Sequence, residues 1–92
     1  MSKNKKSEKK MFINKTENGK NNICGTRITK YRKEKKMSQR ALADKLQLAG
    51  LNVDKNAVQR MESGQRFITD IELTFLCAVL EKSLNQLFGL EP

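Results

Sequence analysis

Between residues 26 and 88 the apolar residues recur three or four positions apart, in five short runs separated by residues that cap or end helices. This spacing follows the 3.6-residue turn of an α-helix and differs from the alternation of a half-buried strand. The only proline is Pro92, so no residue within these runs has to interrupt a helix. The pattern therefore predicts an all-α protein built from five short helices.

Capping residues set the expected bounds of the first three helices. The first pattern runs from residue 26 to about residue 36. Ser38 and Asp54 can accept hydrogen bonds from the free backbone N–H groups that begin a second and a third helix. Gly50 and Gly64 follow the last apolar residues of those helices, where glycine commonly ends a helix in the left-handed conformation.

The last two helices each begin with a capping box. Thr69 with Glu72, and Ser83 with Gln86, have the spacing in which two side chains satisfy two backbone donors reciprocally. The fourth helix carries a core stripe and a second apolar side that includes Phe75. Either the fifth helix and the segment around Phe67 cover this second side, or Phe75 and Val79 belong to a dimer contact.

Positive charge is concentrated in the N-terminal half of the chain. The net charge is +9, and residues 1–50 hold 15 Lys and Arg against 4 Asp and Glu, whereas residues 51–92 hold 4 against 6. This polarity predicts a polyanionic partner met by one side of the molecule. Residues 1–22 are rich in Lys, Asn and Ser with no apolar period, so we expect a disordered basic arm there.

Several classes of function have no support in the composition. The chain has no His, and its two cysteines, Cys24 and Cys77, are far apart without a CxxC spacing, so we predict no metal, no cofactor and no enzyme activity. The longest apolar run, residues 75–80, is far shorter than the ~18 residues of a membrane span. The N-terminus lacks a signal peptide, and we expect a cytoplasmic, nucleoid-associated protein with no membrane partner.

Three segments then carry a resemblance to a known family: residues 37–43 (MSQRALA), 57–64 (AVQRMESG) and 69–73 (TDIEL). In order and spacing they resemble the helix-turn-helix domain of phage Cro and C1-type repressors, also called the xenobiotic-response-element family. The resemblance covers residues 27–87. It implies a lambda-repressor-like five-helix bundle over residues 23–92, with the second and third helices as the DNA-reading pair.

The third predicted helix has the side chains that reading a major groove requires. Arg can hold guanine O6 and N7 together, and Asn or Gln can hold adenine N6 and N7. By position, the resemblance places Lys55, Asn56 and Arg60 at base-reading sites, with Gln59 beside them on the outward side of the helix. A solvated helix face is the alternative interpretation of these four residues.

Phosphate contacts are expected to flank this helix. The resemblance assigns Gln39, in the first turn of the second helix, to a DNA phosphate, where the helix N-terminus also favours an anion. Arg40, Ser63, Gln65 and Arg66 are further candidates on the same surface. The alternative for each of them is an ordinary exposed polar residue.

Arg32 and Glu62 are given a structural role by the same resemblance. They match a partly buried ion pair that ties the first helix to the end of the third. The connection between the second and third helices is about five residues longer than the tight glycine turn usual in the family. We expect the second helix to extend to Ala49, with Leu48, Leu51 and Val53 anchoring the connection on the core.

The sequence thus predicts a DNA-binding transcriptional regulator, acting as a repressor that occupies a palindromic operator as a homodimer. The alternative is an antitoxin or another protein-interaction module of a toxin-antitoxin pair, with a small protein partner. A general nucleic-acid binder driven by the lysines is a third interpretation, although RNA modules usually use exposed aromatic residues and this chain has four Phe and one Tyr.

Overall fold

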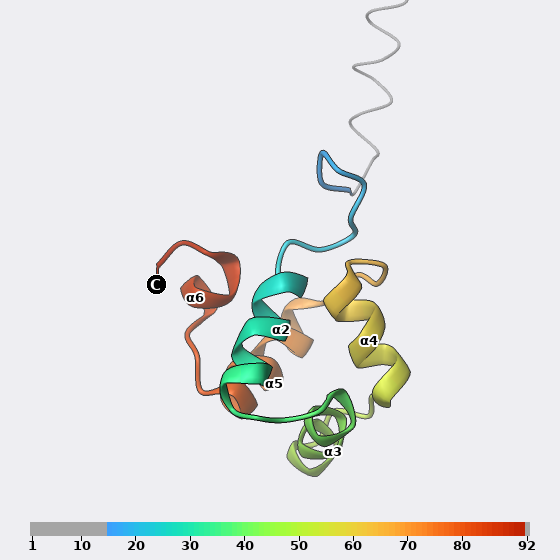
Figure 1. The fold of residues 1–92 in the computed structure, drawn as a ribbon, viewed down its shortest axis with the longest axis vertical. Helices are drawn as coiled ribbons and strands as arrows, with labels where there is room; N and C mark the ends of the chain where they lie inside the picture. The colour runs from blue at the N-terminus through green and yellow to red at the C-terminus, as the bar shows by residue number, and fades with distance from the viewer. Residues whose placement is uncertain (1–14, 92) are drawn as a thin grey trace, which may run out of the picture.

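A computed structural model describes residues 15–91 of the chain. In this part of the chain the regular elements are five α-helices, and no strand occurs. They are α2 (Gly25–Glu34), α3 (Gln39–Ala49), α4 (Lys55–Ser63), α5 (Asp70–Leu80) and α6 (Leu84–Phe88) (Figure 1). The prediction of an all-α helical bundle is confirmed, and most of the predicted disordered arm lies outside the described residues.

The predicted caps begin and end these helices. Ser38 and Asp54 accept from the backbone N–H groups of Ala41 and Ala57, at 3.0 and 2.8 Å. Both capping boxes are formed, at the starts of α5 and α6. α3, α4 and α6 each end at a glycine with a left-handed backbone conformation, so local sequence signals set most helix ends.

All five helices contribute to a single core. Ile28 of α2, Met61 of α4 and Leu87 of α6 are fully buried, and each stabilises the fold by roughly 1.5–3 kcal/mol relative to an exposed position. α3 packs against α4 and α5, while α2 packs against α4, α5 and α6. In Figure 1, α2 lies in the centre of the view between α4 and α6, with α3 below. This arrangement leaves the side of α4 that faces away from α2 uncovered.

Gly25 allows the start of α2 to approach the end of α4. A Cβ atom at this position would lie 2.6 Å from the carbonyl oxygens of both Met61 and Glu62. Real Cβ atoms do not come so close to backbone, so a side chain here would force the two helices apart. The junction places the C-terminal end of α4 against α2.

The connection between α3 and α4 consists of residues 50–54, and α3 extends to Ala49 as predicted. The amide of Gln47 donates to the carbonyl oxygen of Val53 at 2.6 Å, which closes the connection onto α3. Val53 is buried and Leu51 packs partly against the core. The expectation for Leu48 is wrong: it is 89% exposed, because it lies two residues after the buried Leu46 and therefore on nearly the opposite side of α3.

The second apolar side of α5 is only partly covered. Phe75 and Val79 are half-buried and pack against the core cluster. The ring of Phe75 lies over Gly50 at the end of α3, while Val79 shares a hollow with Met37. Phe67 itself is exposed, whereas its neighbour Ile68 is partly buried against the core cluster. The end of α3 therefore covers part of this side of α5.

Residues 15–22 form a turn that is hydrogen-bonded to the rest of the domain. The backbone N–H of Asn21 donates to the carbonyl oxygen of Gly64 at 2.7 Å. The side-chain amide of Asn22 donates to the carbonyl oxygens of Met61 and Arg66, at 3.0 and 2.8 Å. The sequence predicted disorder up to residue 22, but these eight residues make defined contacts in the structure. The part of that prediction covering residues 1–14 falls outside the described residues.

Candidate nucleic-acid interface

α4 has one buried and one exposed side. Ala57, Val58 and Met61 are buried against the core. The exposed side carries the four residues predicted to read bases: Lys55, Asn56, Gln59 and Arg60. Their spacing of i, i+1, i+4 and i+5 places them on one stripe of the helix.

The side chains of this stripe have no partners within residues 15–91. None of the four makes a hydrogen bond or an ion pair through its side chain in this part of the protein. Their donor and acceptor groups are free to bind another molecule. Polar groups of this reach on an exposed helix are what base recognition in a major groove requires.

The start of α4 and the outer side of α3 enclose an open groove of about 360 Å³. Its polar lining comprises Arg40, Asp44 and Gln47 of α3, the cap residue Asp54, and Lys55 and Asn56 of α4, so two carboxylates face the two cations. Arg40 is exposed and makes no side-chain interaction within the described chain. Its guanidinium therefore adds a free positive charge beside the stripe.

Gln39 is held by an internal partner. Its side-chain amide donates to Oε1 of Glu62 at 3.0 Å. An amide NH₂ group has two hydrogens, so one remains for a second acceptor. The contact fixes the position of the Gln39 side chain at the start of α3.

Arg32 and Glu62 form the ion pair that the resemblance implied. Nε of Arg32 lies 2.6 Å from Oε2 of Glu62, and Nη2 lies 3.0 Å from Oε1. Their side chains are 10% and 5% exposed, so the pair is well shielded from water. Burial alone would raise the pKa of Glu62, but hydrogen bonds led by those from Arg32 and Gln39 outweigh it and lower the pKa. The pair joins α2 to the end of α4 and supports Gln39 as well.

The phosphate candidates at and after the end of α4 differ in how free their side chains are. Ser63 and Gln65 are exposed, and the Ser63 hydroxyl donates to the carbonyl oxygen of Arg60 at 3.3 Å. Arg66 is instead paired with Glu72 through two contacts of 2.9 Å. Hydrogen bonding to Arg66, opposed by burial, lowers the pKa of Glu72. The positive charge of Arg66 is therefore largely neutralised within the protein.

Sequence reasoning missed two residues of the turn before α2. The carboxamide oxygen of Asn22 accepts from the backbone N–H groups of Cys24, the N-cap residue of α2, and of Gly25, its first residue. Asn side chains commonly accept from the backbone N–H two residues later, so this contact could have been predicted from the residue type. Lys20 reaches the end of α4 over 43 residues of sequence, which no local pattern signals.

A family model described as helix-turn-helix matches residues 28–87. The chain belongs to the helix-turn-helix family. Within this Cro/C1-type helix-turn-helix protein, α3 and α4 are the two helices that give the motif its name, and the exposed stripe lies on the second of them.

Membership of the helix-turn-helix family makes this a DNA-binding, transcription-regulating protein. No curated protein and no solved structure matched the chain. Among residues 15–91 no helix combines the length and apolarity needed to cross a membrane. The same residues contain no group of three or more His, Cys, Asp or Glu that could hold a metal ion.

Proposed function

We propose that this helix-turn-helix protein is a sequence-specific repressor that occupies a palindromic operator as a homodimer. The observation that supports it best is the stripe of four exposed, partnerless polar side chains on α4. In this proposal Lys55, Asn56, Gln59 and Arg60 contact base edges in the major groove. Each well-placed two-point contact discriminates against the wrong base by about 1–3 kcal/mol.

Residues on both sides of the stripe would hold the DNA backbone. Gln39 and Arg40 lie at the start of α3, while Ser63 ends α4 and Gln65 lies two residues beyond it. Such contacts fix the protein's register on the duplex without reading sequence. Arg66 remains a candidate, although Glu72 reduces the charge it can offer a phosphate. The lysines of residues 1–22 would add attraction that does not depend on sequence.

A homodimer would present two α4 stripes to the duplex, so it would read more base pairs than a single copy can. Two copies related by a two-fold axis would meet half-sites about one helical turn, roughly 34 Å, apart. The outer part of α5 is our candidate for the dimer contact: Phe75 and Val79 keep partial exposure, and the neighbouring Ile71 is 66% exposed. Occupying an operator at the nucleoid would then block transcription, with no chemical step by the protein.

Binding to duplex DNA at increasing salt tests this proposal. If about six phosphates are contacted in total, the logarithm of the affinity should fall with the logarithm of the salt concentration at a slope near −5. A slope near zero would contradict binding to DNA through cationic contacts. Sedimentation of the protein–DNA complex measures how many copies of the protein bind each duplex. If the protein instead forms a stable complex with a second, smaller protein and does not bind DNA as two copies, the antitoxin alternative is favoured.

A further inference from the structure

The turn of residues 15–22 is attached to the C-terminal end of the helix that carries the reading stripe. Asn21 donates from its backbone to Gly64 and from its side chain to the carbonyl oxygen of Gln65, at 2.7 and 2.8 Å. Asn22 binds the carbonyl oxygens of Met61 and Arg66. The turn lies before residue 28, where the match to the helix-turn-helix family begins. The turn therefore lies outside the region matched by the family, and it contacts the end of α4.

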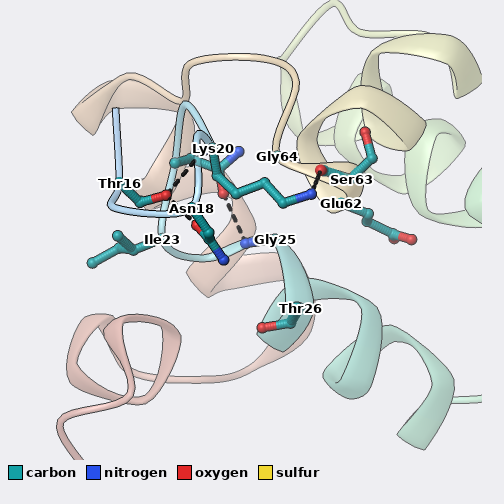
Figure 2. A pocket seen from close by; sticks show the side chains of 10 residues that line it. Thr16, Asn18, Lys20, Ile23, Gly25, Thr26, Glu62, Ser63 and Gly64 are labelled. Atoms are coloured by element: carbon teal, nitrogen blue, oxygen red, sulfur yellow. Dashed lines mark hydrogen bonds between the residues drawn. The ribbon is translucent and has the colours of Figure 1, made fainter. Parts of the chain in front are cut away.

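Lys20 is the residue of this turn whose side chain reaches the last residue of α4. Its side chain passes over Gly64, so that a Cβ atom there would lie 2.6 Å from Cδ of Lys20. Its ammonium group donates to the carbonyl oxygen of Ser63 at 3.0 Å, as the dashed line in Figure 2 shows. Lys20 is exposed and forms part of the wall of a hollow of about 400 Å³. Two of its three ammonium hydrogens remain available to an acceptor.

Without Lys20 this end of α4 would be unfavourable for a phosphate. The last carbonyl groups of a helix carry a partial negative charge, which repels anions. The nearby guanidinium of Arg66 is neutralised by two contacts with Glu72. Ser63 and Gln65 offer hydrogen bonds but no charge. Lys20 places a positive charge directly on the terminal carbonyl of the helix.

We propose that the turn of residues 15–22 is part of the DNA-binding surface and that Lys20 contacts a phosphate at the C-terminal end of α4. This inference rests on the proposed function. Ser63 lies four residues after Gln59 and so continues the exposed stripe by one helical turn. A duplex lying along the stripe would reach Lys20 next. The lysine would grip the DNA backbone without distinguishing base sequences.

Substitution of Lys20 tests the proposal against a matched control. Lys20→Gln should reduce the magnitude of the salt slope by about 0.9, which corresponds to roughly an eightfold weaker affinity at 0.1 M salt. The loss should be equal for operator and unrelated duplexes. Lys20→Arg should retain the wild-type slope. Lys45→Gln removes the same charge from an exposed position of α3 beside Val79 and Glu81, and should leave the slope unchanged.

The slope separates a phosphate contact from a purely structural role. A lysine that only stabilises the end of α4 would change the thermal midpoint but not the slope measured below that midpoint. A wild-type slope near −5 with identical slopes for Lys20→Gln and Lys45→Gln would overturn this inference and leave the proposed function intact. A wild-type slope near zero would overturn both.

Discussion

Arg66 and Glu72 face each other in a two-point ion pair, with Nη1 to Oε1 and Nη2 to Oε2 distances that are both 2.9 Å. Arg66 follows the candidate reading helix, whereas Glu72 belongs to the first turn of α5. Nη1 of Arg66 also donates to the carbonyl oxygen of Phe67 at 3.1 Å. The pair therefore fixes the loop between α4 and α5, and it limits the charge that Arg66 can present to DNA.

Replacing Glu72 by Gln should strengthen binding to every duplex. Gln can still complete the capping box with Thr69, but it no longer neutralises Arg66. The salt slope should become steeper by up to about 0.9 as Arg66 gains a phosphate contact. Fluorescence anisotropy titrations at several salt concentrations measure this. Adding Arg66→Gln should abolish the gain, and a slope unchanged by Glu72→Gln would show that Arg66 lies away from the DNA.

Replacing Glu62 by Ala should destabilise the protein strongly. The substitution leaves the guanidinium of Arg32 shielded from water without its carboxylate partner, because that side chain is only 10% exposed. Breaking a buried pair in this way costs about 3–5 kcal/mol of unfolding free energy. Urea unfolding followed by circular dichroism measures the loss. Glu81→Ala breaks the exposed pair with Lys35 and should have little effect, so equal losses for the two variants would contradict a buried role for Glu62.

The same carboxylate should make stability depend on acid pH. The pKa of Glu62 is lowered in the folded protein, because hydrogen bonds from Arg32 and Gln39 outweigh burial. Its contribution is then complete above the pKa of the unfolded chain, about 4.3, and is lost as the pH falls through the lower folded value. The difference in unfolding free energy between wild type and Glu62→Gln should shrink over that window. A difference that stays constant from pH 6 to pH 3 would contradict the lowered pKa.

Substitution should lower the unfolding free energy strongly at Leu46 and hardly at all at Leu48. Leu46 is fully buried, and replacing it by Ala should cost about 2–5 kcal/mol. Leu48 is 89% exposed, so Leu48→Gln should leave the unfolding free energy within about 0.5 kcal/mol of wild type. Thermal or urea unfolding of both variants makes the comparison. A large loss for Leu48→Gln would indicate that α3 ends earlier and that Leu48 turns into the core.

Local sequence signals predicted the helices well for a physical reason. Residues such as Asp54 and Thr69 satisfy backbone donors only a few positions away, so the bond that starts a helix is visible in a short window of sequence. The left-handed glycines Gly50 and Gly64 mark helix ends in the same local way. The exposure of the α4 stripe followed as well, because helical spacing divides buried from exposed positions.

Contacts between distant residues were beyond these signals. Asn22 and Lys20 look like members of a polar, lysine-rich segment, and their partners on α4 lie about 40 residues away in sequence. The sequence suggested an unpaired cation at Arg66, whereas in the folded protein its guanidinium is paired with Glu72. The exposure of Leu48, by contrast, follows from helical spacing once α3 extends to Ala49, so it could have been predicted from the sequence. For Lys20, Asn22 and Arg66 the partner was fixed by tertiary packing.

Selecting bound sequences from a random pool of duplexes tests most directly whether the exposed stripe of α4 reads DNA. Wild-type protein should enrich a palindrome whose half-sites are about one helical turn apart. Arg60→Ala should relax the preference at one base pair of each half-site while leaving the other positions intact, because it removes a base contact of about 1–3 kcal/mol. No enriched sequence with wild-type protein, or an unaltered preference with Arg60→Ala, would contradict the account.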